Sequence, residues 1–223
     1  MPDKKLSKPR IKEHIRKYAP IYLVGFIICL LLTDLLYTTT RPQTPYEAEV
    51  MIYLADVYTN PDPLSDIAQQ ALEYGKQADE TLESVHFEAL PYSDPESDYT
   101  SSYLLMARAS LGDCDLYFAS ALCADALCRM QLSYPLDDAL ASGWMADSGL
   151  EPYMYTDEET GETIAAGMKL DALPNLANLG AMYNEGAVLI VASNGTNIET
   201  SMNVAEYIVE AIGRAEVPAA SEG

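Results

Sequence analysis

The segment Ala187-Val-Leu-Ile-Val-Ala192 consists of six consecutive apolar residues. A strand with one face in water alternates apolar and polar residues, so an unbroken apolar run indicates a strand that is buried on both faces. Two earlier segments, Glu49-Val-Met-Ile-Tyr-Leu-Ala55 and Asp115-Leu-Tyr-Phe-Ala-Ser120, have a similar character. Burial on both faces is typical of parallel strands covered by helices on each side. These three segments therefore predict the centre of an α/β sheet.

Helical patterns separate these strands. Apolar residues recur at helical spacing after Ser65, which we expect to be the N-cap of a helix, and again from Asn197 to Gly213. The remaining segments continue the alternation: a half-buried strand at 85–90, helices near 99–111 and 122–132, a helical turn at 136–140, a hairpin at 153–169 with its tip at 157–161, and a helix-prone connection at 174–184. This order predicts an α/β domain with a single doubly wound, mostly parallel sheet and helices on both faces.

The charge of the chain is divided by position. The 223 residues include 13 basic and 34 acidic side chains, which gives a net charge of −21. Residues 1–18 carry a net charge of +5, whereas residues 41–223 carry −25. A nucleic-acid-binding protein needs a basic face to replace the counterions around phosphate, so this composition argues against a nucleic-acid partner.

An apolar segment, residues 19–37, lies between the two charge blocks and contains one charged residue, Asp34, near its far end. At about 1.5 Å per residue, a helix of this length spans roughly 28 Å, which is close to the thickness of a hydrocarbon core. Because the basic flank precedes the segment, a retained anchor would keep the N-terminus in the cytoplasm and place the acidic domain outside. A cleaved signal peptide and a buried helix of a soluble domain are the alternatives.

This interpretation gives the domain organisation of a single-pass protein of the cell membrane. We expect a basic cytoplasmic leader (1–18), a transmembrane signal anchor (19–37), a tether (38–45), an extracellular α/β domain (46–216) and a disordered tail (217–223). The prolines of the tether, Pro42 and Pro45, favour an extended backbone.

Polar residues that follow the central strands are candidates for binding a ligand. Open parallel sheets bind ligands outside the carboxyl ends of their strands. The residues at these ends that can form hydrogen bonds or stack on a sugar or peptide are Asp56, Tyr58, Ser120, Ser193 and Asn194. If the sheet is mostly parallel, their three loops should lie near one another. The alternative is that these residues only cap helices and turn the chain.

Residues suited to catalysis or metal binding are few. His14 lies in the leader and His86 in a predicted strand, and the sequence contains no nucleophile elbow, Cys-x-x-Cys pair or Gly-rich phosphate loop. We therefore expect no catalytic residue, metal site or cofactor. Cys114, Cys123 and Cys128 favour structural burial, with one disulfide or a metal site as the alternatives.

Carboxylates are abundant, so clusters of them are expected by chance. Asp94, Glu96 and Asp98 resemble a fragment of a calcium loop but lack the glycine and the final glutamate of an EF-hand. Residues 157–159 and Glu162 are expected to form a solvated turn at the hairpin tip. A pair of carboxylates of the glycosidase kind is left open.

Several segments together resemble a known family. The segment at 115–120 is followed by a helix and by Tyr134-Pro-Leu-Asp-Asp138, a hairpin leads into Ala165-Ala-Gly-Met-Lys-Leu170, and Val188-Leu-Ile-Val-Ala-Ser-Asn194 precedes a helix that contains Glu206-Tyr-Ile-Val. In this respect most of residues 49–212 is similar to the first lobe of bacterial extracellular solute-binding proteins of the type 2 periplasmic kind. In that family the second lobe is inserted before the late apolar strand, where this chain has only residues 171–186. The resemblance therefore implies a single lobe.

These observations together predict a membrane-anchored extracellular binding or interaction module that is not catalytic. Its partners would be the membrane, through residues 19–37, and a small solute, a cell-wall component or a neighbouring membrane protein. One alternative is an extracellular hydrolase that uses paired carboxylates. Another is the substrate-receptor subunit of a transporter, completed by dimerisation, because closure around a solute needs two lobes.

Overall fold

The structure, a computed structural model, describes residues 8–40, 45–94, 96, 98–183 and 185–215. The chain divides into two compact units, Met1–Gln43 and Thr44–Gly223. The second unit contains one six-stranded sheet and two hydrophobic clusters, so it has a core of its own and can fold without the first. The predicted tail, 217–223, lies outside the described residues.

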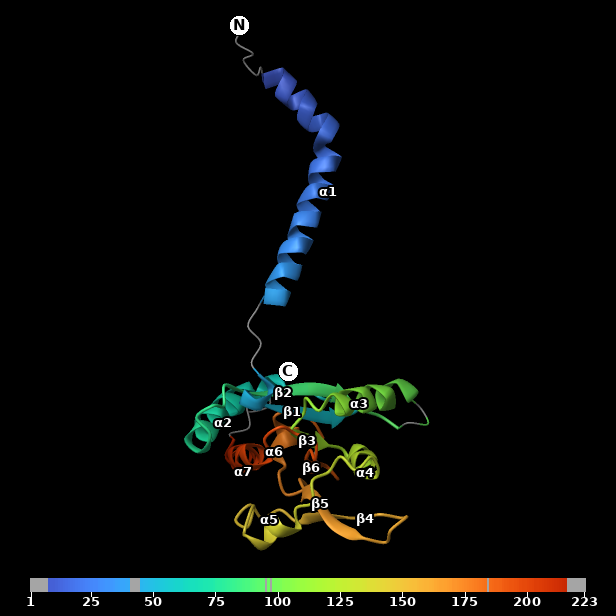
Figure 1. The fold of residues 1–223 in the computed structure, drawn as a ribbon, viewed down its shortest axis with the longest axis vertical. Coiled ribbons are helices and arrows are strands. Elements are labelled where there is room, and N and C mark those ends of the chain that lie inside the picture. The colour runs from blue at the N-terminus through green and yellow to red at the C-terminus, as the bar shows by residue number, and fades with distance from the viewer. Residues whose placement is uncertain (1–7, 41–44, 95, 97, 184, 216–223) are drawn as a thin grey trace, which may run out of the picture. The chain divides into compact units, whose positions relative to one another are not determined.

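The first unit contains one long helix, α1 (Lys8–Thr40), which is bent in its N-terminal part, where it includes Pro20 (Figure 1). Its stretch Arg16–Tyr37 is 22 residues long with a mean hydropathy of 2.2, and none of its apolar window is buried. This exposure contradicts the alternative of a buried core helix. The length and composition fit a single membrane crossing, and they also fit a signal sequence.

The helix is longer than the predicted anchor. It takes in residues 8–18 of the leader and 38–40 of the tether, whereas its apolar stretch ends at Tyr37, the last residue of the predicted anchor. The four residues 41–44 lie outside the described part of the chain, and Pro45 comes directly before the 3-10 helix η1 (Tyr46–Ala48). The helix continues through the threonines at its end because no glycine or proline stands between Gly25 and Pro42.

The second unit is built on a mixed sheet with the strand order β2-β1-β3-β6-β5-β4. Its strands are β1 (Glu49–Asp56), β2 (Ser84–Pro91), β3 (Leu116–Ala119), β4 (Pro152–Thr156), β5 (Thr163–Lys169) and β6 (Val188–Val191). Strand β1 pairs in parallel with β2 and β3, whereas β6 is antiparallel to both of its neighbours, β3 and β5, and β4 is antiparallel to β5. The prediction of a mostly parallel sheet is therefore correct only for the β2-β1-β3 half.

The predicted direction of β6 was wrong because an unbroken apolar run indicates burial and carries no information on strand direction. All four residues of β6 are buried, as their sequence predicts. Burial on both faces follows from the position of β6 between β3 and β5, and a central strand has this environment whichever way it runs. Strand direction depends on the connection: residues 170–187, which the structure describes except for residue 184, lead from β5 to β6 with no long crossover helix, and the two strands pair antiparallel.

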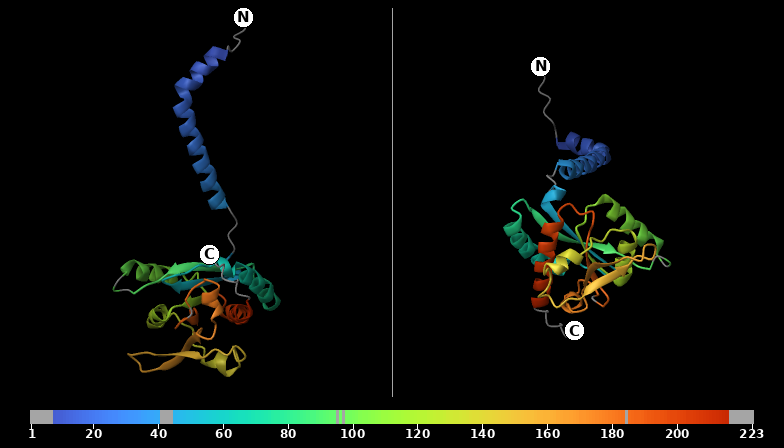
Figure 2. Two further views of the ribbon diagram at one scale, coloured as in Figure 1. Left: turned by 180° about the vertical axis from the view of Figure 1, so that it is seen from behind. Right: turned by 60° about the horizontal axis from the view of Figure 1, so that its bottom comes forward.

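Helices cover both faces of the sheet, as predicted. The helices α2 (Ser65–Ala78) and α7 (Ile198–Arg214) pack on one face, and α3 (Tyr99–Leu111) and α4 (Ala121–Arg129) pack on the other (Figures 1 and 2). Alternate residues of the central strands point into the two clusters. Phe118 and Leu189 join the α2–α7 side, while Tyr117 and Ile190 join the α3–α4 side.

Three short helices complete the unit: η2 (Asp62–Leu64), α5 (Asp137–Ala141) and α6 (Asn175–Asn178). Two of the long helices, α3 and α7, begin at side-chain caps. The Asp98 side chain accepts hydrogen bonds from the Thr100 and Ser101 N–H groups, and Asn197 accepts one from Thr200 N–H. Ser65 is not a cap, because η2 runs directly into α2 and Leu64 occupies the N-cap position.

Candidate functional site

Two of the predicted site residues meet at the carboxyl ends of β1 and β3. The two strands are parallel, and Ala55 lies opposite Ala119, so Asp56 and Ser120 follow their strands at the same edge of the sheet. The Ser120 N–H donates a hydrogen bond of 2.8 Å to the Ala55 carbonyl oxygen. Parallel pairing therefore brings Asp56, Tyr58 and the start of α4 together, as the sequence predicts.

Ser193 and Asn194 lie at the opposite edge, so the expectation that the three loops gather is wrong. Because β6 is antiparallel to β3, its last residue, Val191, is opposite the first residue of β3, Leu116. The Ser193 hydroxyl donates to the Gln131 carbonyl at 3.0 Å. The Asn194 side-chain amide donates to a carbonyl at the end of α3, that of Ala109, at 2.7 Å. Asn194 therefore joins the loop after β6 to the end of α3, and Ser193 joins it to the turn after α4.

The segment that precedes β6 lies at the carboxyl ends of β1 and β3, where Ser193 and Asn194 were expected. Met182 forms an antiparallel bridge with Thr59, and the Asn60 N–H donates to the Ala181 carbonyl at 2.7 Å. This arrangement places the Tyr183 ring 6.0 Å from the Tyr58 ring, centroid to centroid. Tyr183 was not among the predicted site residues because it precedes β6, and β6 was expected to run parallel to β3. With β6 antiparallel to β3, the residues before β6 lie at the carboxyl ends of β1 and β3.

We call Asp56, Tyr58, Ser120 and Tyr183 the β1–β3 edge. Tyr58 and Tyr183 are 47% and 61% exposed, so their rings are open to solvent, whereas Asp56 is only 6% exposed. One Asp56 carboxylate oxygen, Oδ1, accepts a hydrogen bond of 2.7 Å from the Val57 N–H. Burial raises the pKa of Asp56 above its ordinary value, and the backbone N–H groups of Val57 and Tyr183 oppose this rise.

The N-terminus of α4 contributes the other polar element of the edge. The Ser120 side chain accepts a hydrogen bond of 3.4 Å from the Cys123 N–H and caps the helix. The buried Cys123 thiol has a raised pKa, mainly through desolvation and also through the charge of Asp56. Because Asp56 and Ser120 follow paired parallel strands, the carboxylate lies near the first turn of α4, where the positive end of the helix dipole favours it. The edge thus offers two exposed rings for stacking beside a carboxylate that accepts hydrogen bonds.

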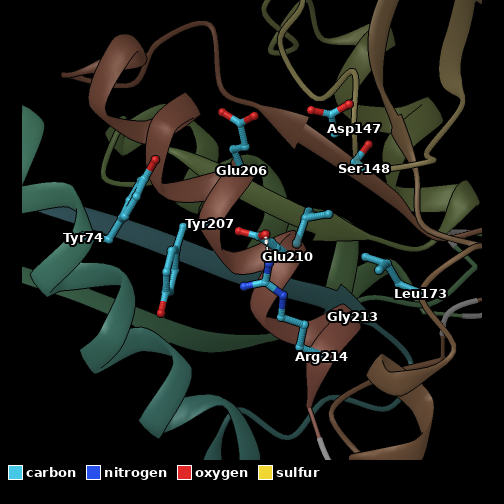
Figure 3. A pocket seen from close by; sticks show the side chains of 10 residues that line it. Tyr74, Asp147, Ser148, Leu173, Glu206, Tyr207, Glu210, Gly213 and Arg214 are labelled. Carbon is cyan, nitrogen blue, oxygen red and sulfur yellow. Dashed lines mark hydrogen bonds and ion pairs between the residues drawn. The ribbon is translucent and has the colours of Figure 1, made fainter.

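A second feature is a groove of about 410 Å³ beside the outer face of α7 (Figure 3). Tyr74 of α2 and Tyr207 of α7 stack there with ring centroids 4.8 Å apart. Glu206 and Glu210 also line the groove, and Glu210 forms an ion pair with Arg214. No sequence pattern singled out this groove, because it joins residues of α2 and α7 with the loop after α5.

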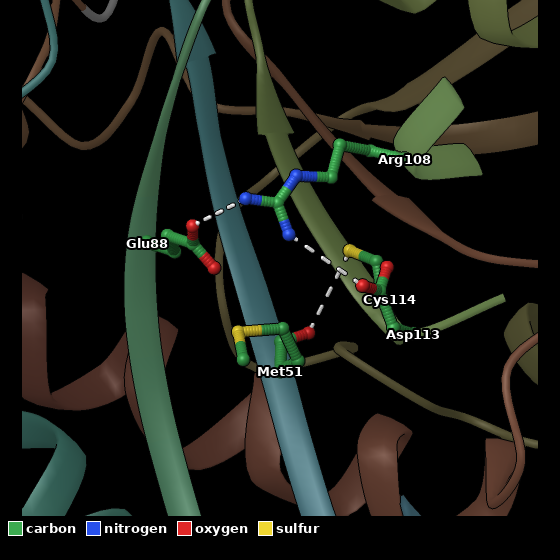
Figure 4. A network of polar contacts seen from close by, with 5 residues as sticks. All are labelled: Met51, Glu88, Arg108, Asp113 and Cys114. Atoms are coloured by element: carbon green, nitrogen blue, oxygen red, sulfur yellow. Dashed lines mark hydrogen bonds and ion pairs between the residues drawn. The ribbon is translucent and has the colours of Figure 1, made fainter. Parts of the chain in front are cut away.

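A polar network fixes the C-terminal half of α3 on the sheet (Figure 4). Arg108 donates to Glu88 of β2 at 3.0 Å and lies 3.7 Å from Asp113. The Cys114 thiol contacts the Met51 carbonyl oxygen of β1 at 3.7 Å. Since both carboxylates face the guanidinium, Arg108 is turned toward the sheet and away from the outer face of its own helix.

The other residues considered for chemistry have structural positions. Cys114, Cys123 and Cys128 are buried and free, which agrees with structural burial and contradicts a disulfide. Within the described residues, no group of three or more His, Cys, Asp or Glu side chains is arranged to hold a metal ion. The His86 side chain contacts the Glu49 carboxylate on the neighbouring strand.

The clustered carboxylates serve as caps and turns. Asp94 accepts a hydrogen bond of 3.0 Å from the Glu96 N–H, while Asp98 is the N-cap of α3. At the hairpin tip, Asp157 accepts bonds from the Glu159 and Thr160 N–H groups at 2.7 and 2.9 Å, which lowers its pKa. The tip is therefore the turn that the sequence predicts.

Comparisons of the chain with protein-family models, with curated proteins and with solved structures found no match.

Proposed function

We propose that the chain is a membrane-anchored extracellular binding module that holds a small solute at the β1–β3 edge without transforming it. The observation that carries this proposal is the meeting of three different groups at one edge: the shielded Asp56 carboxylate, the capped start of α4, and the open Tyr58–Tyr183 pair. Sites of this mixed character, apolar rings with a few fixed polar groups, are typical of solute binding.

The chemistry of the edge favours a solute with hydroxyl or amine donors and an apolar face, such as a sugar or a peptide. A donor group would bond to the remaining lone pairs of Asp56, and the flat face of the solute would stack on Tyr58 or Tyr183. The resemblance to the solute-binding proteins implies a single lobe, whereas that family closes two lobes around its solute. With a single lobe, the solute would be held against an open surface, so we expect weak affinity.

The anchor supports the extracellular location. Helix α1 is long and apolar enough to cross a membrane once, and its basic flank comes first in the chain. A reporter fused after residue 215 tests the topology. Activity of an alkaline phosphatase fusion, which needs an oxidising compartment, supports the proposal, whereas activity of a cytoplasmic reporter at the same position contradicts it.

A thermal-shift screen of residues 45–223 against sugars, peptides, amino acids and divalent ions tests the binding function. A ligand at about one hundred times its dissociation constant adds about 2.7 kcal/mol, which raises Tm by roughly 5–10 °C for a domain of this size. We expect the shift to vanish in Tyr58→Ala and Asp56→Asn and to persist in Ser193→Ala, the matched control at the opposite edge. A hit that survives both edge variants, or no hit in any class, would contradict a solute site here.

A further inference from the structure

The outer face of α3 differs from those of the other long helices of the domain. Exposed positions of α2 include Asp66, Glu73 and Lys76, and those of α7 include Glu206 and Glu210. The exposed positions of α3 contain no charged residue. They are Tyr99, Thr100, Tyr103, Leu104, Met106, Ala107, Ser110 and Leu111. In a region with a net charge of −25, an uncharged helix face of this length is typical of interaction surfaces.

The one charged residue of α3 is directed elsewhere. Arg108 pairs with Glu88 and Asp113 on the side of the sheet, as Figure 4 shows, so it does not interrupt the apolar face. The large side chains remain in solvent: Tyr99 and Leu111 are 74% and 71% exposed, and Tyr103 is 62% exposed. We call the eight exposed positions the α3 face.

The order of large and small residues on the α3 face indicates what covers it. Tyr103 and Leu111 stand four residues before and four residues after Ala107, on the same side of the helix. A two-fold axis through Ala107 would therefore place Tyr103 of one copy against Leu111 of the other, at both ends of the contact. The small Ala107 would let the two helices approach closely at the axis. We propose that the α3 face is the contact between two copies of this chain, packed as an antiparallel helix pair.

The size of the face and the anchor support this partner. Burying the five large side chains would remove on the order of 600 Å² per copy, somewhat below the roughly 800 Å² of a standard interface. Such a contact is weak in dilute solution. Copies anchored in one membrane share a plane and an orientation, and this raises their effective concentration. The acidic remainder of each copy repels the other, so salt should tighten the dimer by screening, the reverse of its effect on an interface of opposite charges.

Oxidative cross-linking of the full chain in phosphatidylcholine vesicles tests the geometry. With Cys29→Ser in the background, the remaining native cysteines are buried. Ala107→Cys would put two thiols near the axis, within the short Cβ–Cβ distance that a disulfide requires. Met154→Cys on β4 is the control. We expect a cross-linked dimer band for Ala107→Cys and none for Met154→Cys. Equal bands for both variants, or none for either, would overturn the proposal.

Sedimentation of residues 45–223 tests the contact without α1. Met106 and Met154 are 54% and 52% exposed, so they form a matched pair inside and outside the α3 face. We expect Met106→Lys to raise the dissociation constant of the dimer about tenfold or more, and Met154→Lys to leave it unchanged. Equal dissociation constants in the two variants, or a dimer that weakens as salt is raised, would refute this contact. The outcome does not depend on the β1–β3 edge, so failure of the solute screen leaves this test valid.

Discussion

Replacing Asp115 by asparagine should change how the stability of the domain depends on pH. Asp115 precedes β3 and is only 5% exposed, and its Oδ2 atom accepts a hydrogen bond of 2.9 Å from the Met51 N–H. Burial raises its pKa to about 6, against the opposing effect of the Met51 and Thr196 N–H groups. The native state therefore holds this proton over a range of pH in which the unfolded chain has already lost it.

The sign of the effect follows from this difference. A group whose pKa is raised on folding stabilises the native state at low pH, and this contribution is lost as the pH rises from about 4 through about 6. A rise from the ordinary value of 3.8 to about 6 corresponds to a loss of about 3 kcal/mol once the carboxylate is fully ionised in the native state. The amide side chain introduced by Asp115→Asn carries no charge at any of these pH values, so this part of the pH dependence disappears in the variant.

Urea denaturation of residues 45–223, followed by circular dichroism between about pH 4 and pH 7, measures the effect. The free energy of unfolding of Asp115→Asn relative to wild type should rise by about 2.5 kcal/mol across this range, less than the full value of about 3 kcal/mol because at pH 4 the unfolded chain has already lost part of this proton. The absolute stability of the variant is a separate quantity, because an amide offers one acceptor oxygen where the carboxylate offers two. Asp157→Asn is a control of opposite sign, since turn N–H groups lower the pKa of Asp157, and that stabilisation is lost as the pH falls. Parallel curves for wild type and Asp115→Asn would refute the reasoning.

Three further predictions concern local structure and are measured by the same denaturation experiment. Ser120→Ala should destabilise the domain by about 1 kcal/mol through loss of the α4 cap, and an unchanged midpoint would contradict that role. Gly167→Ala should destabilise it by more than about 2 kcal/mol, because the added Cβ would lie 2.5 Å from the Leu189 carbonyl oxygen. In Gly213→Ala of α7, the added Cβ would lie 3.7 Å from the Leu173 side chain, an ordinary contact, so the variant should stabilise the domain by about 0.5–1 kcal/mol. Equal effects of the two glycine variants would contradict the steric argument.

Much of the secondary structure could be predicted because its signals are local. The strands at 49–55 and 115–120, the hairpin tip at 157–161 and the closing helix all agree with the structure to within a few residues. Each depends on the spacing of apolar side chains or on turn residues, and the chain carries this information within one segment. The same holds for α1, whose apolar length and basic flank are visible without any tertiary contact.

The candidate site could be predicted only in part. Asp56 and Ser120 follow strands that are parallel, so the rule for the carboxyl ends of strands placed them correctly. The rule failed for Ser193 and Asn194 because it can be applied only when the direction of β6 is known. A fully apolar strand has the same sequence pattern whether it is parallel or antiparallel to its neighbour. Tyr183 replaced them for the same reason.

The sequence by itself determined where the chain is apolar, where it turns, and that an acidic α/β domain follows a long apolar helix. The tertiary structure alone decided that β6 runs against β3, which ring stands beside Tyr58, and that Arg108 turns inward and leaves the α3 face uncharged. The reason is physical. Secondary structure and burial depend on neighbours a few residues away, whereas strand direction and side-chain pairing depend on residues that folding brings together from distant parts of the chain.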